Sequence, residues 1–131
     1  MSCRLDHVMV RTNDLDRSIQ FYEQVFGMFL ENRDPHPEDG YDLAFMKCPV
    51  SDMKIELTYN YDEPEYVVGN AWGHISFYVD GAMDKLRLAD EFFGLETRHR
   101  IHESTHDKKY IIGVIMSPEG IEIAVVEKLE G

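Results

Sequence analysis

The chain has 131 residues and a mass of 15.3 kDa, which fits one ordinary domain or two very small fused modules. Its 13 basic and 25 acidic side chains give a formal net charge of −12, which argues against nucleic acid and anionic membrane surfaces as partners. With 44% hydrophobic residues, apolar runs no longer than a strand and no signal-peptide pattern at the N-terminus, the sequence predicts a cytoplasmic globular protein.

The first half of the chain predicts one helix and four strands. Alternation of apolar and polar residues predicts a strand over Leu5–Arg11. Apolar residues spaced by four, three and four positions predict a helix from Leu15 to Phe26, capped by Asn13-Asp14 and ended by Gly27. Three further strands and one proline-containing loop follow in this order: Met28–Arg33, the loop Asp34–Gly40, Tyr41–Lys47 and Met53–Tyr59.

The same order of elements returns after a linker at 61–70. The expected elements of the second half are a strand at Trp72–Val79, a helix at Gly81–Phe93, a strand at Glu96–Ile101, a loop at His102–Lys108, and strands at Lys109–Met116 and Ile121–Glu127. Each half therefore reads β-α-β-β-β.

Matching segments support an internal duplication. The segment around His7 matches the one around His74 at a period of 67, and Phe26-Gly27 matches Phe93-Gly94 at the same period. The strand Ile55-Glu56-Leu57 has a counterpart in Ile121-Glu122-Ile123, at a period of 66.

The duplication predicts an α+β fold of two tandem βαβββ modules. We expect module 1 at about 1–60 and module 2 at about 71–127, within a single domain spanning 1–131. Each module should be a curved four-stranded sheet with one helix, closing only part of a barrel.

A histidine opens each half and a glutamate lies near the end of each. A lone histidine on a strand is usually a core or edge residue, but recurrence at one position of a duplicated fold favours a metal site. Neutral imidazole and carboxylate suit divalent Zn, Ni, Co, Fe or Mn.

The residues also resemble a known family over Leu5 to about Glu127. The chain resembles the vicinal oxygen chelate superfamily and, within it, the short bacterial form of glyoxalase I. The motifs that carry the resemblance are Leu5–Arg11, Asp14–Tyr22, Phe26-Gly27-Met28, Ile55–Asn60 and Trp72–Ile75, of which Ile55–Asn60 is the most specific.

The resemblance implies an enzyme that converts the hemithioacetal of a 2-oxoaldehyde such as methylglyoxal and a thiol such as glutathione into a thioester. The family's metal ligands fall on His7, Glu56 and His74, with nickel or cobalt favoured and zinc possible. Its glutathione-holding residues fall on Arg11 and Asn60. The family also implies a homodimer in which two chains share each site.

The family's fourth ligand, which is also its catalytic base, is where this sequence departs. Counted without gaps from Pro118-Glu119-Gly120, that position is Ala124, whereas the internal repeat favours Glu122. Positions 122 and 124 are two residues apart, which is about 6.6 Å along a strand, so a carboxylate at one cannot replace a carboxylate at the other. The ungapped count is preferred. Glu56 is then the candidate base, or the reaction is a different one.

Two alternatives stay open on the same fold. Ala124 also fits a non-catalytic, bleomycin-resistance-like protein that sequesters a ligand, or another metal-dependent reaction, with ring-cleaving dioxygenases fitting worst. His99, His102 and His106, at spacings of three and four, would suggest a metal face if they lay on a helix, but Ser104, Thr105 and Asp107 favour a solvated loop. The basic residues Arg98, Arg100, Lys108 and Lys109 fit either a mixed-charge surface or a seat for substrate carboxylates.

Overall fold

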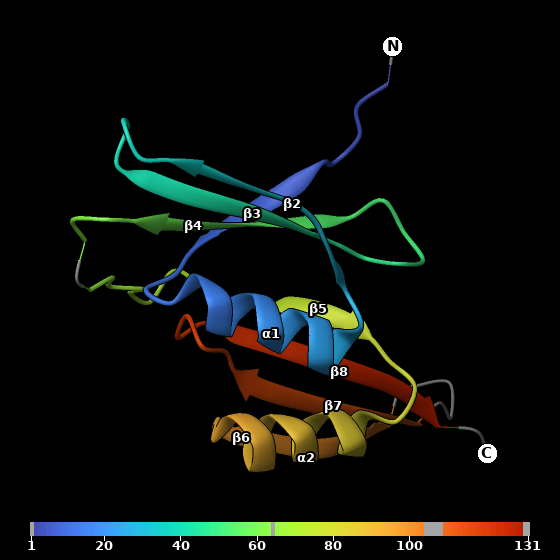
Figure 1. Cartoon of the computed structure of the whole chain (residues 1–131). Helices are drawn as coiled ribbons and strands as arrows, with labels where there is room; N and C mark the ends of the chain where they lie inside the picture. Colours follow the sequence, from blue (N-terminus) through green and yellow to red (C-terminus); the bar gives the residue numbers. More distant parts are fainter. Residues whose placement is uncertain (1, 64, 104–108, 130–131) are drawn as a thin grey trace. The chain divides into compact units, whose positions relative to one another are not determined.

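The computed structural model describes residues 2–63, 65–103 and 109–129. The chain divides into two compact units, Met1–Val67 and Val68–Gly131, and each holds one helix and one four-stranded sheet (Figure 1). The two tandem βαβββ modules are thus confirmed, and neither sheet closes into a barrel. Within the described ranges, no helix is long and apolar enough to cross a membrane.

Unit 1 is a mixed sheet with one covering helix. Its first and last strands in sequence are parallel neighbours, and the remaining pairs are antiparallel, in the order β1-β4-β3-β2. The elements are β1 (His7–Arg11), α1 (Leu15–Phe26), β2 (Phe29–His36), β3 (Tyr41–Lys47) and β4 (Lys54–Asn60).

The two ends of α1 lie where the sequence predicts them. The Asp14 side chain accepts a hydrogen bond from the backbone N–H of Arg17 at 3.0 Å, which satisfies one of the free donors at the helix start. Gly27 ends the helix in the left-handed region, at φ 66°, where glycine lacks the Cβ that other residues would strain.

Strand β2 runs further than the sequence predicts. The expected loop at 34–40 is a turn only from Pro37 onward, because Asp34, Pro35 and His36 continue the pairing with β3. Proline cannot donate a ladder hydrogen bond, but β2 is an edge strand whose outer side needs no donor.

Unit 2 repeats the topology in the order β5-β8-β7-β6. Its first strand begins after His74, later than predicted, and β6 includes His102 and Glu103 of the expected loop. The rest of that loop, 104–108, lies outside the described residues. The elements are β5 (Ile75–Tyr78), α2 (Ala82–Phe93), β6 (Thr97–Glu103), β7 (Lys109–Met116) and β8 (Glu122–Leu129).

Helix α2 is capped by a residue far away in the sequence. Its N-cap, Gly81, has no side chain to offer, and the Glu127 carboxylate of β8 accepts the backbone N–H groups of Gly81 at 2.8 Å and Ala82 at 3.0 Å. These two backbone hydrogen bonds lower the pKa of Glu127, because they stabilise its charged form. Glu127 therefore ties the last strand to the start of the second helix.

The Glu127 cap makes unit 2 sensitive to pH. A carboxylate whose folded pKa is lowered stabilises the fold above its unfolded pKa, and the effect is lost as pH falls through the folded value. We expect Glu127→Gln to lower the melting temperature at neutral pH, with the difference from wild type shrinking in acid. Melting curves from neutral to acidic pH measure this. The exposed Glu63→Gln is the control, and equal loss in both variants would contradict the capping role.

Candidate metal and substrate site

One face of the unit 1 sheet gathers the predicted site residues. Burial alternates along β1 and β4, where Val10, Ile55 and Leu57 are buried. Residues of the other parity lie on the opposite face, since successive side chains in a strand alternate. On this face, called the polar face of unit 1, lie His7, Arg11, Glu56 and Asn60, together with the same-parity residues Met9, Lys54 and Thr58.

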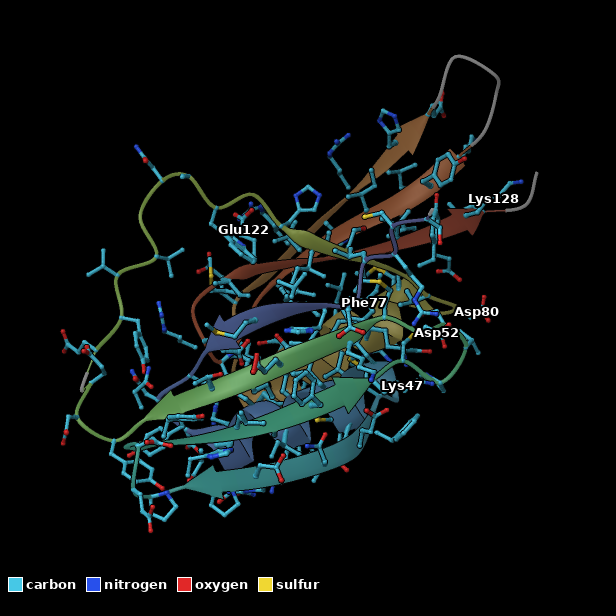
Figure 2. The ribbon with its side chains drawn as sticks, turned by 90° about the horizontal axis from the view of Figure 1, so that it is seen from above. Lys47, Asp52, Phe77, Asp80, Glu122 and Lys128 are labelled. Atoms are coloured by element: carbon cyan, nitrogen blue, oxygen red, sulfur yellow. The ribbon has the colours of Figure 1, made fainter. Side chains whose placement is uncertain are left out.

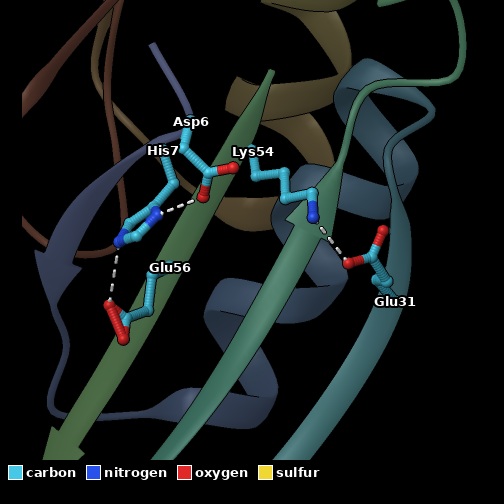
Figure 3. A network of polar contacts seen from close by, with 5 residues as sticks. All are labelled: Asp6, His7, Glu31, Lys54 and Glu56. Atoms are coloured by element: carbon cyan, nitrogen blue, oxygen red, sulfur yellow. Dashed lines mark hydrogen bonds and ion pairs between the residues drawn. The ribbon is translucent and has the colours of Figure 1, made fainter. Parts of the chain in front are cut away.

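His7 and Glu56 come together on this face. In the parallel pairing of β1 with β4, His7 is opposite Lys54, and Glu56 is two residues further along, opposite Met9. The His7 Nε2 and Glu56 Oε2 atoms are 3.6 Å apart, which is too long for a hydrogen bond (Figure 3). The Glu56 side chain is 18% exposed and that of His7 36%, so both reach the surface from a partly sheltered position.

The spacing of these two atoms suits a shared metal ion. Two ligands each about 2.0–2.2 Å from a tetrahedral ion lie about 3.3–3.6 Å apart. Imidazole nitrogen and carboxylate oxygen are also a donor set that divalent transition metals accept. Among the described residues no three His, Cys, Asp or Glu side chains converge, so unit 1 alone offers a pair of ligands.

The His7 ring is held from two other sides. Its Nδ1 lies 2.7 Å from Asp6 Oδ2, and this hydrogen bond lowers the pKa of Asp6. The ring of Phe45, which is opposite Glu56 on β3, meets the imidazole edge to face with centroids 5.2 Å apart. Sequence reasoning missed both contacts, because neither residue has a spacing or composition signal that marks it.

Lys54 does not neutralise Glu56. Its ammonium lies 2.9 Å from Glu31 Oε1 on β2, and that hydrogen bond raises the pKa of Lys54 (Figure 3). The lysine thus pairs with the edge strand of the sheet.

Arg11 and Asn60 lie at the far end of the polar face. Each is four residues beyond His7 or Glu56 on its strand, which corresponds to about 13 Å. The Asn60 amide donates to the Tyr66 hydroxyl at 3.2 Å, a partner that sequence reasoning also missed. The structure therefore places four of the five predicted site residues on one face.

His74, the fifth, belongs to unit 2. It is exposed and directly precedes β5, in which Ile75 pairs with Ile123 of β8. Extending this parallel register by one residue puts His74 opposite Glu122, as His7 is opposite Lys54 in unit 1.

The same register decides which residue of β8 corresponds to Glu56. In unit 1, Met9 is opposite Glu56, and in unit 2 the matching Ser76 is opposite Ala124. The antiparallel partners agree, since Phe45 is opposite Glu56 and Val114 is opposite Ala124. The strands thus follow the ungapped count to Ala124 and not the 66-residue repeat that favoured Glu122.

The faces of unit 2 support this equivalence. A Cβ added to Gly113 would lie 2.8 Å from Val125 and 2.9 Å from Leu86 of α2, so Gly113 and Val125 face the helix. Glu122 and Ala124 have the other parity and share the opposite face.

Glu122 is engaged in an ion pair of its own. Its carboxylate accepts a hydrogen bond from Arg98 of β6 at 2.8 Å. Glu122 is the first residue of β8 (Figure 2). Lys54 is likewise the first residue of β4. Both units therefore link this position to the outermost strand by an ion pair, Lys54 to Glu31 and, with the charges reversed, Glu122 to Arg98.

Arg100 and His102 of β6 and Lys109 of β7 form local contacts. Arg100 contacts His102 at 3.2 Å, and Lys109 pairs with Glu103 at 3.6 Å. His106 and Lys108 lie outside the described residues. The described residues of the basic patch, Arg98, Arg100 and Lys109, thus each contact a side chain of the same sheet.

A protein-family comparison identifies the chain. The model of the Glyoxalase/Bleomycin resistance protein/Dioxygenase superfamily matches residues 4–125. The chain belongs to this superfamily. The predicted membership in the vicinal oxygen chelate proteins is therefore confirmed.

Individual relatives point to one branch of the superfamily. The lactoylglutathione lyase of Salmonella typhimurium is 37% identical over 126 residues, covering 95% of this chain and 92% of that protein. The lactoylglutathione lyase of Neisseria meningitidis serogroup A is 33% identical, covering 98% and 93%. Their similarity over nearly the whole chain confirms the prediction of an enzyme of the glyoxalase I type.

Solved structures agree. The trypanothione-dependent glyoxalase I of Leishmania major superposes with a TM-score of 0.77 at 29% identity, covering 96% of this chain and 87% of that one. Glyoxalase I of Zea mays gives a TM-score of 0.76 at 27% identity, covering 96% of this chain and 47% of that one. The structural comparison thus identifies the same fold and the same glyoxalase I branch of the superfamily as the sequence comparison does.

Proposed function

We propose that the protein is a metal-dependent glyoxalase I. It isomerises the hemithioacetal of a 2-oxoaldehyde and a thiol, with glutathione as the thiol, as in the names of its bacterial relatives. The observation that carries the proposal is the 3.6 Å separation of His7 Nε2 and Glu56 Oε2, on a face that also bears Arg11 and Asn60.

The proposed ligands are His7, Glu56 and His74. A divalent cation held by them, nickel or cobalt by preference and zinc as a possibility, supplies Lewis-acid polarisation of the substrate oxygens. Three protein ligands leave positions at which substrate can bind. The ligand set draws on both units, so the cytoplasmic homodimer with shared sites remains part of the proposal.

Glu56 is the proposed base. Its carboxylate takes the proton from the carbon that bears the sulfur and hydroxyl groups and returns it to the neighbouring carbonyl carbon, while the hydroxyl proton passes to the former carbonyl oxygen. The hemithioacetal then becomes a 2-hydroxy thioester without any change in composition. With Ala124 at the other carboxylate position, Glu56 has no counterpart in β8 to share this task.

Arg11 and Asn60 are the proposed thiol-binding residues. They lie about 13 Å along the sheet from His7 and Glu56. An extended tripeptide spans about 10 Å, so a glutathione thiol near Glu56 leaves the end of the peptide within reach of Arg11 and Asn60.

Ala124 favours one competing function. Without a carboxylate at position 124, the polar face could still bind a ligand. The protein would then sequester the thiol adduct without converting it. Measured turnover of the hemithioacetal of methylglyoxal and glutathione separates this from the glyoxalase proposal.

Metal binding tests the ligand set directly. Nickel or cobalt at a hundredfold excess over Kd should stabilise the fold by about 2.7 kcal/mol and raise the melting temperature. We expect Glu56→Ala and His74→Ala to abolish the rise, and the control His99→Ala to keep it. Thermal melts with and without metal measure this, and an unchanged response in both ligand variants would refute the site.

The role of Ala124 is tested by supplying the carboxylate. Ala124→Glu should tighten metal binding and raise the isomerase rate, within the 10²–10⁴-fold that a positioned general base typically contributes. Ala124→Gln, equal in size but uncharged, is the matched control and should not raise the rate.

Glu122→Gln should leave metal affinity and rate unchanged, because Glu122 is paired with Arg98. Calorimetry with cobalt and a thioester absorbance assay measure both quantities. If Glu122→Gln loses metal binding, and Ala124→Glu gains neither metal affinity nor isomerase rate, then Glu122 is the fourth ligand.

A further inference from the structure

The hydrogen bond between His7 and Asp6 has a consequence for the site. Asp6 directly precedes β1, and its Oδ2 lies 2.7 Å from His7 Nδ1 (Figure 3). An ionised carboxylate can only accept a hydrogen bond, so Nδ1 carries the proton.

The other ring nitrogen of His7 is the one that faces Glu56. When the imidazole is neutral and Nδ1 is protonated, Nε2 has a free lone pair. Nε2 is the atom 3.6 Å from Glu56 Oε2. The tautomer set by Asp6 is therefore the one in which the nitrogen beside Glu56 is able to bind a metal.

The neighbouring charges leave Asp6 free for this role. Lys54, which is opposite His7 in the sheet, is paired with Glu31 at 2.9 Å. The Asp6 side chain is 62% exposed and lies outside the strand, so it does not contribute to the core. Its position is explained by the imidazole it contacts.

The second unit lacks this arrangement. At the 67-residue period that relates His7 to His74, the residue matching Asp6 is Gly73, which has no side chain. His7 thus has a neighbouring carboxylate that orients it, and His74 has no equivalent at the preceding position.

We propose that Asp6 is a positioning residue that holds His7 in its Nδ1-protonated form, so that the Nε2 lone pair faces Glu56. The role of this tautomer in metal binding rests on the proposed function, whereas the tautomer itself does not. Outer partners of this kind typically change metal affinity by 10–100-fold when removed.

Nitrogen NMR of metal-free protein tests the proposal. Long-range proton–nitrogen spectra of histidine-labelled protein, recorded above the ordinary imidazole pKa of about 6.5, distinguish the two neutral tautomers and the imidazolium. Wild type should show His7 protonated at Nδ1, and Asp6→Ala should lose that preference. Asp6→Asn, whose amide oxygen also accepts, should retain most of it. His74 serves as the internal comparison.

A His7 that is protonated at Nε2 or fully charged in wild type, or unchanged in Asp6→Ala, would overturn the proposal. As a second readout, cobalt affinity should fall 10–100-fold in Asp6→Ala and not in the exposed control Asp52→Ala. Equal affinities would count against the positioning role. If wild type binds no cobalt, the proposed function fails, and the tautomer result alone decides the role of Asp6.

Discussion

The site depends on the register of one parallel strand pair in each unit. Because side chains alternate along a strand, pairing β1 with β4 as observed brings His7 and Glu56 onto one face, offset by two residues along the strands. A shift by one residue would turn Glu56 toward the helix, and a shift by two would move it about 6.6 Å along the sheet. No single side chain sets this geometry. It follows from the backbone ladder of the whole sheet.

The two units share one topology but differ in the residues at matching positions. Unit 1 carries the His7–Glu56 pair, with the imidazole hydrogen-bonded to Asp6 and packed against Phe45. Unit 2 keeps the histidine but has Ala124 in place of the carboxylate. Both units have the same topology and an ion pair to the outermost strand, while Glu56 of unit 1 is matched by Ala124 in unit 2. The proposed reaction therefore depends on Glu56 far more than on any residue of β8.

Local signals in the sequence predicted much of the fold. The N-cap at Asp14 and the glycine at position 27 mark the ends of α1, and the 67-residue period predicted the two modules and pairs His7 with His74. The Glu127 cap of α2 and the Asp6–His7 bond could not be predicted, because each depends on geometry that spacing does not encode.

The repeat at period 66 misled for a physical reason. By register, Glu56 corresponds to Ala124, a period of 124 − 56 = 68, because each is the third residue of its strand and lies opposite Met9 or Ser76. The Ile-Glu-aliphatic pattern is short, and alternation along a strand allows it to match at a position two residues away. The ungapped family count reached Ala124, as the strands do.

The most direct test of this account is the register of β5 against β8 in solution. Cross-strand proton contacts measured by nuclear Overhauser spectroscopy report which residues of two neighbouring strands lie opposite each other. The account predicts contacts that place Ser76 opposite Ala124 and Phe77 opposite Val125. Contacts that place Ser76 opposite Glu122 would contradict it, because Glu122 would then stand where Glu56 stands in unit 1.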